Sequence, residues 1–255
     1  MPSTSPYLFG QAAGAYSAFR PEYPPELFAR VLSFLPPDRR HCAMDLGAGT
    51  GKSTIPLLDY FAEVIAVEPD PLMAEKLRAS APRAVIRDVS AEDCIQEADS
   101  VDLVTAVAAL HWMEIPRVMS NIVRWLRPEG LLVVGSGGFP QVPAPVQQVV
   151  REQFERHWNR FRDSRLDFSD SPQRTRSEIA ELRIVEDTSV TMSYSVTPAI
   201  FAGFCRSTSY GSAYARALSD PELYWLELEN RFRQAWPEEK FPIDFNPWLL
   251  IARKE

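Results

Sequence analysis

Asp45-Leu46-Gly47-Ala48-Gly49-Thr50-Gly51 is the stretch that decides the fold. It begins at the end of a short apolar run, 42–46, and precedes a segment, 52–61, that suits a helix. Glycine has no Cβ, so glycines placed here let the chain turn tightly and bring its backbone close to a ligand. The first turn of a helix also offers free N–H groups and a partial positive charge, which suit a carboxylate or a phosphate. The stretch therefore predicts a ligand-binding turn between a strand and a helix.

Three classes of glycine-rich site compete for this stretch. Gly51-Lys52-Ser53 ends like a phosphate-binding P-loop, but a P-loop needs a glycine where Leu46 stands. A dinucleotide site of the G-x-G-x-x-G type needs its third glycine where Lys52 stands. The acidic-x-G-x-G-x-G pattern of an S-adenosylmethionine (SAM) site matches at every position from 45 to 51. The spacing favours the SAM class and leaves the two nucleotide classes as alternatives.

Strand-like and helix-like segments alternate along the first half of the chain. We expect strands at 42–46, 63–67, 84–86, 101–107 and 131–134, and helices at 25–35, 52–61, 70–80, 91–96 and 115–126. The strands are almost continuously apolar, which indicates a parallel sheet covered by helices on both faces. The pattern predicts an α/β fold with a Rossmann-like, doubly wound, mostly parallel sheet.

The sequence predicts a single domain, 1–255, with four regions. We expect an N-terminal arm and helix at 1–37 and a ligand-binding core at 38–136. A helix-rich region at 137–240, with a strand near 187–196, would supply a cap over the substrate. The segment 241–255 is expected to add one more strand at the edge of the sheet.

Composition excludes several classes of function. The net charge is −7, and the densest basic stretch, 151–165, is interrupted by Glu152, Glu155 and Asp163, which argues against a nucleic-acid partner. The three cysteines lack C-x-x-C spacing, so neither a metal site nor a disulfide framework is expected. No segment resembles a signal peptide or a membrane span. These features predict a cytoplasmic protein and leave its oligomeric state open.

Glu68 ends the second expected strand, roughly 20 positions after Gly47. An acid in this place accepts hydrogen bonds from a ribose diol and repels a ribose 2′-phosphate. The alternative is that Glu68 only caps the following helix, a role that Asp70 could also fill. Beside the glycine stretch, ribose binding is the favoured interpretation.

Residues 41–135 resemble the class I SAM-dependent methyltransferases, and most closely the small-molecule type represented by the trans-aconitate and methyltransferase type 11 groups. Besides the glycine stretch and Glu68, the resemblance is carried by Ser90-Ala91-Glu92, Leu110-His111-Trp112 and Leu126-Arg127-Pro128-Glu129-Gly130. The arm contributes Phe9, Ala13, Tyr16, Arg20-Pro21 and Tyr23-Pro24, and a weaker likeness covers 203–210. The remaining C-terminal part is too divergent to name a specific member.

The resemblance implies about seven strands, an N-terminal arm, a helical cap insertion and SAM as cofactor. It implies that the methionine part of SAM packs on the glycine turn, near Asp45, and that Glu68 binds the ribose. Leu72 or Met73 would lie against the adenine, with Ala91 and Glu92 on its other side. The full implied cofactor site is Asp45, Gly47, Ala48, Gly49, Gly51, Glu68, Pro69, Leu72, Met73, Ala91, Glu92, Val107 and Ala108.

The implied reaction is in-line transfer of a methyl group to a small-molecule acceptor, either a carboxylate or an O, N or C nucleophile of a natural product. Alignment of the reactants supplies much of the rate, and a base is needed only if the acceptor must lose a proton. His111 is the one candidate base, with packing beside SAM as the alternative role. The expected acceptor-binding residues are Tyr16, Arg20, Tyr23, His111, Trp112, Phe139, Arg206 and Tyr210.

Ordinary structural roles remain open for these acceptor-binding residues. Aromatic side chains at helical spacing pack in cores, and arginines form salt bridges at surfaces. Two other functions also remain open for the chain as a whole. One is an NAD(P)-dependent oxidoreductase on the same fold, and the other is a regulator that binds SAM without catalysis.

Overall fold

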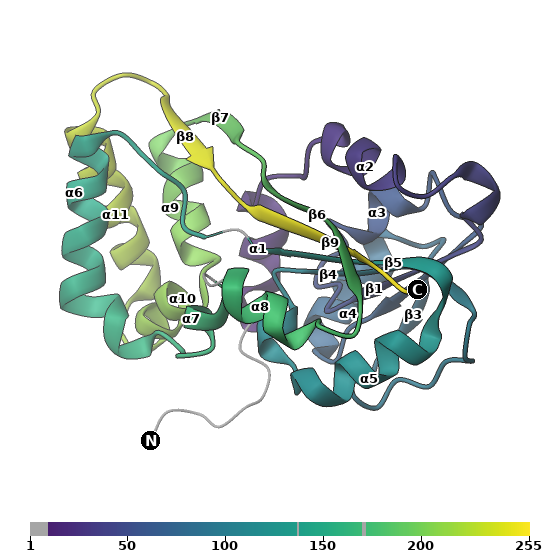
Figure 1. Ribbon diagram of the computed structural model, residues 1–255. Helices are drawn as coiled ribbons and strands as arrows, with labels where there is room; N and C mark the ends of the chain where they lie inside the picture. The colour runs from purple at the N-terminus through teal and green to yellow at the C-terminus, as the bar shows by residue number, and fades with distance from the viewer. Residues whose placement is uncertain (1–9, 137, 170–171) are drawn as a thin grey trace. The chain divides into compact units, whose positions relative to one another are not determined.

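The computed structural model describes residues 10–136, 138–169 and 172–255 (Figure 1). The chain forms two compact units. The sheet unit consists of Glu22–Gly138, Arg165–Val190 and Pro247–Glu255. The helical unit consists of the chain up to Pro21, Phe139–Ser164 and Thr191–Asn246. Each unit is described by itself.

The sheet unit is built on one seven-stranded sheet in the order β3-β2-β1-β4-β5-β9-β6. Its strands are β1 (Cys42–Leu46), β2 (Glu63–Val67), β3 (Val85–Arg87), β4 (Val101–Val107), β5 (Leu126–Ser136), β6 (Arg183–Ser189) and β9 (Trp248–Arg253). β3, β2, β1, β4 and β5 pair in parallel, whereas β9 runs antiparallel to both β5 and β6. The order reverses between β1 and β4, and open α/β sheets bind their ligands at the carboxyl ends of the strands beside such a reversal.

Helices cover both faces of this sheet. They are α2 (Pro25–Leu32), η2 (Pro37–Arg39), α3 (Thr54–Leu57), α4 (Pro71–Ser80), η3 (Leu110–Trp112), α5 (Ile115–Trp125), α7 (Leu166–Ser169) and α8 (Pro172–Glu178). Val118, Ile122 and Trp125 of α5 are buried in one apolar cluster, while Leu27 and Val31 of α2 belong to another. Figure 1 shows α2 and α5 on opposite sides of the strands. The doubly wound fold expected from the sequence is therefore confirmed.

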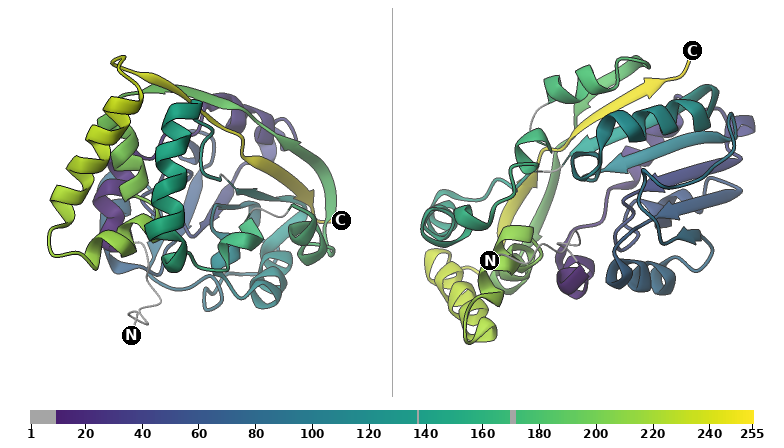
Figure 2. Two further views of the ribbon diagram at one scale, coloured as in Figure 1. Left: turned by 90° about the vertical axis from the view of Figure 1, so that its left-hand side faces the viewer. Right: turned by 90° about the horizontal axis from the view of Figure 1, so that it is seen from below.

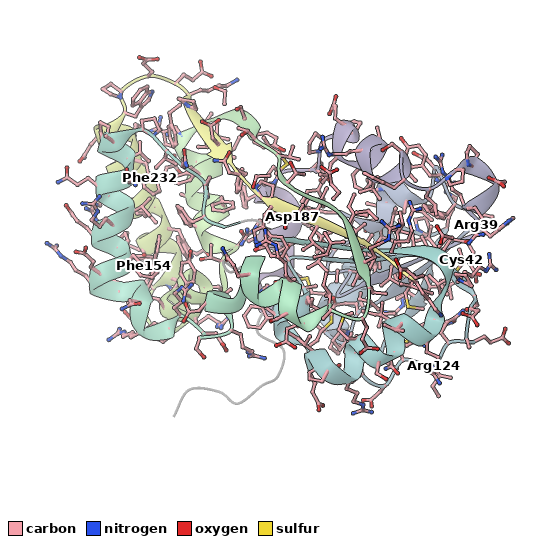
Figure 3. All side chains as sticks on the ribbon, in the orientation of Figure 1. Arg39, Cys42, Arg124, Phe154, Asp187 and Phe232 are labelled. Carbon is pink, nitrogen blue, oxygen red and sulfur yellow. The ribbon has the colours of Figure 1, made fainter. Side chains whose placement is uncertain are left out.

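The helical unit packs its helices around an aromatic core. Its elements are η1 (Gly10–Ala12), α1 (Ala13–Phe19), α6 (Ala144–Gln153), η4 (Phe154–Trp158), η5 (Asn159–Phe161), β7 (Met192–Val196), α9 (Pro198–Arg206), α10 (Ser209–Arg216), α11 (Pro221–Ala235) and β8 (Phe241–Phe245). Phe232 of α11 is fully buried and lies 4.9 Å from the ring of Phe201, measured between centroids (Figure 3). Figure 2 shows α6, α9 and α11 grouped in this unit, and β7 pairs with β8 beside them.

Two expected helices differ from the structure. The helix expected at 52–61 is only Thr54–Leu57. After it, the N–H groups of Leu58, Asp59 and Tyr60 donate to carbonyls three residues back, which is the bonding of tight turns rather than of an α-helix. The helix expected at 91–96 is a turn at 91–93 followed by irregular chain. There the amide of Asn121 donates to the carbonyls of both Ala91 and Glu92, so tertiary bonds occupy groups that a helix would use.

Three strand predictions also need correction. The segments 187–196 and 241–255 each hold parts of two strands, which belong to different sheets. The last strand, β9, lies inside the sheet rather than at its edge, because β6 pairs with its outer side. The strand expected at 131–134 is longer, because β5 begins at Leu126, and Glu129 within it has a positive φ of 66°.

None of the helices in the described part of the chain is both long and apolar enough to cross a membrane.

Candidate active site

The glycine turn after β1 has the backbone that its sequence predicts. Gly47, Gly49 and Gly51 have φ values of 65°, 58° and 95°, in the left-handed region that side chains disfavour. A Cβ on Gly47 would lie 2.6 Å from the Cβ of Ala109, so the turn after β1 packs directly on the turn after β4. A Cβ on Gly49 would meet nothing within 4 Å. Gly47 is thus required by packing, whereas Gly49 borders open space.

Glu68 lies at the end of β2 and joins this turn to the helix that follows. Its Oε2 accepts a hydrogen bond from the N–H of Gly49, and its Oε1 accepts one from the N–H of Asp70, both at 2.8 Å. Burial raises the pKa of Glu68 to about 7, and the two backbone hydrogen bonds oppose this rise. The cap of α4 is Asp70, whose carboxylate accepts from the N–H groups of Leu72 and Met73. Glu68 is therefore not the helix cap.

Asp45 is the buried centre of a cluster of hydroxyl groups. Its carboxylate accepts hydrogen bonds from Ser53 at 2.7 Å, Thr54 at 2.6 Å and Thr105 at 2.7 Å. Burial raises the pKa of Asp45, and the three hydroxyl donors oppose this effect. The cluster joins the end of β1 to α3 and to β4, so Asp45 holds the glycine turn in place.

The residues expected beside the adenine differ in exposure. Leu72 has 47% of its surface exposed, whereas Met73 is only 3% exposed and packs inward. Of the two, Leu72 is the side chain that a ligand can reach. Ala91 is buried, and the carboxylate of Glu92 accepts a hydrogen bond of 2.6 Å from the N–H of Glu114.

The end of β4 carries the last two residues of the implied cofactor site. Val107 and Ala108 are half-buried, and Ala108 has an unusual φ of 53°. The N–H of Ala108 donates to the carbonyl of Gly135 at 2.7 Å, which fixes this conformation. A strained non-glycine residue of this kind is typical of functional turns.

His111 and Trp112 follow in the short helix η3. His111 is buried, and its ring centroid lies 4.7 Å from that of Trp112. The guanidinium of Arg165 lies over the Trp112 ring, 4.7 Å from its centroid. Because the turn that holds Ala109 packs on Gly47, His111 and Trp112 lie in the turn next to the glycine turn.

The other expected acceptor-binding residues are divided between the two units. Tyr23 belongs to the sheet unit and packs against the cluster that holds α2. Tyr16, Arg20, Phe139, Arg206 and Tyr210 belong to the helical unit. Arg206 forms an exposed ion pair with Glu222, as the surface alternative anticipated. Burial raises the pKa of Tyr210, whose ring lies 5.8 Å from those of Phe154 and Trp158.

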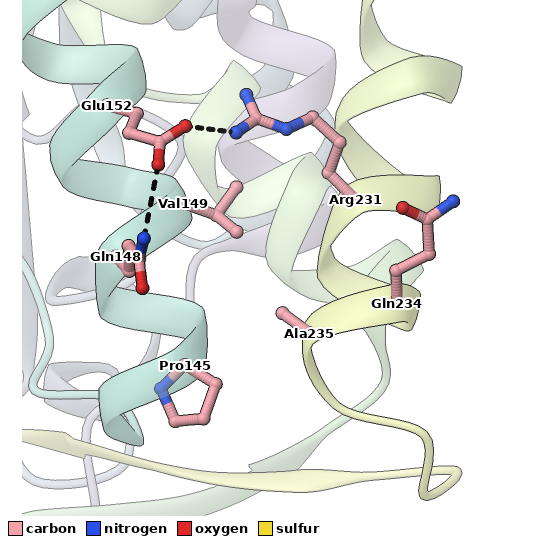
Figure 4. Close-up of a pocket in the computed structure, with 7 residues that line it drawn as sticks. All are labelled: Pro145, Gln148, Val149, Glu152, Arg231, Gln234 and Ala235. Carbon is pink, nitrogen blue, oxygen red and sulfur yellow. Dashed lines mark hydrogen bonds and ion pairs between the residues drawn. The ribbon is translucent and has the colours of Figure 1, made fainter.

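A shallow pocket of about 350 Å³ lies between α6 and α11 of the helical unit (Figure 4). Its rim includes the ion pair between Glu152 and Arg231. None of the cofactor-binding or acceptor-binding residues expected from the sequence lines it. In the described ranges, no group of three or more His, Cys, Asp or Glu side chains could hold a metal ion.

Sequence reasoning missed the hydroxyl partners of Asp45. Ser53 and Thr54 directly follow the glycine stretch, and this adjacency was a usable signal. Thr105 lies on β4, and only the pairing of Asp45 with Thr105 in the β1–β4 register brings the two together. The position of Arg165 over Trp112 was also missed, because nothing in the basic stretch at 151–165 points to that ring.

Comparisons with known proteins identify the family of this chain. The model of the methyltransferase domain family matches residues 44–134. An uncharacterized methyltransferase of Mycobacterium tuberculosis is 34% identical over 177 residues, which span 60% of this chain and 70% of that protein. Trans-aconitate 2-methyltransferase of Deinococcus radiodurans is 33% identical over 118 residues, which span 46% of this chain and 43% of the relative.

A solved structure assigned as a type II methyltransferase of Anaeromyxobacter dehalogenans shares the fold. It superposes with a TM-score of 0.76 at 24% identity, over 92% of this chain and 98% of that one. The matched family model begins at β1 and ends in β5, so it contains the glycine turn, Glu68 and the turn after β4. The cofactor of this family is SAM. The chain belongs to the SAM-dependent class I methyltransferases.

Proposed function

We propose that this methyltransferase acts on a small-molecule acceptor, either a carboxylate or an O, N or C nucleophile of a natural product, by in-line displacement. The observation that supports the cofactor site most directly is the glycine turn bound to Glu68 beside the reversal of strand order. The family match does not favour the oxidoreductase or the non-catalytic alternative.

The residues at this turn fit SAM. The open space beside Gly49 leaves room for a ligand at the backbone. Each oxygen of Glu68 accepts one hydrogen bond within the protein, and a carboxylate has about four acceptor positions, so two remain for a ribose diol. The exposed side chain of Leu72 offers an apolar surface for an adenine.

We further propose how the chain's own residues promote transfer. Bound SAM supplies a methyl group already activated by the sulfonium charge. The glycine turn and Glu68 orient the cofactor, and the packed turn after β4 excludes water beside it. For an acceptor with a hydroxyl proton, His111 would accept that proton, since it lies in the adjoining turn. Trp112 would pack on the acceptor.

Several observations support a small molecule as the acceptor. The net charge of −7 disfavours a polyanionic nucleic acid. One relative is named for trans-aconitate, a small polycarboxylate.

The chain's three cysteines, Cys42, Cys94 and Cys205, are free and buried, which suits the reducing cytoplasm that we propose as its location.

The test of the cofactor site is isothermal titration of the full chain with SAM, S-adenosylhomocysteine and NADH. Wild type is compared with Glu68→Ala and with the control Glu75→Ala, an exposed acid on α4. Loss of hydrogen bonds to a charged group weakens binding by roughly 1.5–3 kcal/mol, which is about ten- to hundredfold. We expect the wild type to bind SAM, Glu68→Ala to bind it more weakly by this factor, Glu75→Ala to bind it as the wild type does, and none of the three to bind NADH.

The acceptor class needs a separate screen. Wild-type protein is incubated with SAM and with separate pools of small acids, phenols, RNA and peptides, and S-adenosylhomocysteine is measured. Release of product with a small-molecule pool supports the proposal. SAM binding without turnover in any pool would favour a regulator, and turnover only with RNA or peptide would contradict the proposed acceptor.

A further inference from the structure

The end of the N-terminal arm is docked firmly within the helical unit. A Cβ on Gly203 would lie 2.4 Å from ring atoms of Phe19, so α1 approaches α9 as closely as a glycine permits. Arg20 follows at the end of α1 and is half-buried. The approach of the two helices therefore fixes the backbone that carries the Arg20 side chain.

The side chain of Arg20 is fixed as well. Its Nε donates a hydrogen bond of 2.9 Å to the hydroxyl of Ser207, which is fully buried. Ser207 in turn donates to the carbonyl of Phe204 at 2.6 Å, so its hydroxyl presents a lone pair to the arginine. The guanidinium carbon lies 4.6 Å from the ring centroid of Phe204 and 5.2 Å from that of Tyr16. Stacking and one anchored donor hold the guanidinium plane in a single orientation.

This guanidinium has no counter-charge within the described part of the chain. No carboxylate there forms an ion pair with Arg20, and no acceptor lies within hydrogen-bond distance of its two Nη groups. Arg206, only one residue before Ser207, instead binds both oxygens of Glu222, at 2.9 and 2.6 Å. A half-buried cation that lacks an anion is unfavourable unless a ligand supplies one.

We propose that Arg20, anchored by Ser207 and stacked on Phe204, is a binding subsite for the carboxylate of an organic acid with an apolar body. The two Nη groups form the planar fork that binds a carboxylate through two hydrogen bonds. Phe139 packs edge-on against Phe204, with 5.4 Å between ring centroids, and extends the apolar surface under the ligand. That this acid is the methyl acceptor rests on the proposed function.

The test compares two ligands of the same shape and different charge, 4-fluorobenzoate and 4-fluorobenzamide. Their binding to the full-length protein is measured by ¹⁹F NMR titration. The variants are Arg20→Gln, Arg20→Lys and Ser207→Ala. The control is Arg233→Gln, whose side chain forms an exposed ion pair with Glu229 in the same unit. Circular dichroism checks that each variant is folded, and the same samples are titrated with S-adenosylhomocysteine.

We expect wild type to bind the benzoate at least tenfold more tightly than the benzamide. Arg20→Gln should remove this preference, Arg20→Lys and Ser207→Ala should reduce it several-fold, and Arg233→Gln should preserve it. Equal binding of the two ligands, binding of neither, or a preference that survives Arg20→Gln would overturn the subsite. If Arg20→Gln does not fold, the ligand preferences of Arg20→Lys and Ser207→Ala decide whether the subsite exists. Failure of the wild-type protein to bind S-adenosylhomocysteine would instead count against the proposed function and not against the subsite.

Discussion

The N–H of Gly49 and the carboxylate of Glu68 are joined by a hydrogen bond of 2.8 Å, which connects the turn after β1 to the end of β2. The bond places a carboxylate with a raised pKa of about 7 at the expected ribose position. A ribose diol donates hydrogen bonds, so it binds the ionised carboxylate better than the protonated one. Cofactor affinity and the protonation of Glu68 are therefore expected to be coupled.

We expect the affinity for S-adenosylhomocysteine to rise between pH 6 and pH 8. A carboxyl with a pKa of about 7 goes from mostly protonated to mostly ionised over this range, which corresponds to a change of roughly tenfold. Titration calorimetry at several pH values measures the change. Glu68→Gln cannot ionise and should show a flat profile, apart from titration of the ligand itself. Identical profiles for the variant and the wild type would contradict the coupling.

The same raised pKa predicts how folding stability depends on pH. The folded-state pKa of about 7 lies above the ordinary value of 4.5, so the folded protein holds this proton more tightly than the unfolded chain. The stability that Glu68 contributes is then complete below about pH 4.5 and is lost as the pH rises through 7. The loss is roughly 3 kcal/mol. Urea unfolding should show the free energy of unfolding of wild type falling relative to that of Glu68→Gln over this interval; a constant difference would count against it.

Alanine at Gly47 and at Gly49 should have different effects. Both substitutions place a side chain at positive φ, which costs about 1 kcal/mol. Gly47→Ala also forces a Cβ to within 2.6 Å of Ala109, so it should destabilise the fold severely. Gly49→Ala meets no atom of the protein, so it should fold but bind SAM at least tenfold more weakly. Thermal unfolding and calorimetry separate the two, with the exposed helical Gly14→Ala as control. Normal SAM binding by Gly49→Ala would show that the open space is not the cofactor's.

Asp45→Asn should weaken the fold through its hydroxyl partners. The amide retains only one acceptor oxygen for the hydroxyls of Ser53, Thr54 and Thr105, and its NH₂ group cannot accept. An unsatisfied buried group costs about 1–3 kcal/mol, which urea unfolding can measure. The matched control is Asp59→Asn, at an exposed ion pair with Arg83. If both variants lost equally little stability, the cluster would not be what holds the turn.

The sequence was sufficient to predict the sheet core because its signals are local. Apolar runs fixed β1, β2 and β4 to the residue, and the glycine spacing located the turn that the structure places at the reversal of strand order. Glu68, rather than Asp70, was predicted to bind the ribose only because it directly follows the strand expected at 63–67. These features depend on residues within one strand–turn–helix segment.

Features that depend on distant contacts were not predictable. The position of β9 between β5 and β6 is decided by pairing across the chain, and its own apolar pattern suits an edge or an interior equally. Arg20 and Arg206 looked alike as candidate ligands, and only the contact of Arg206 with Glu222 separates them. The hydroxyl of Thr105 likewise reaches Asp45 only through strand register.

The place of β9 in the sheet also constrains the order in which the chain can fold during its synthesis. β5 and β6 leave the ribosome before the strand that must separate them, because Trp248–Arg253 comes later in the chain than Arg183–Ser189. Until then, the β5 edge of a nascent chain has no native neighbour and β6 has none at all. Direct pairing of β5 with β6 would be a kinetic trap. The residues of the helical unit that are translated between β6 and β9 delay the arrival of β9 and so the closure of the sheet.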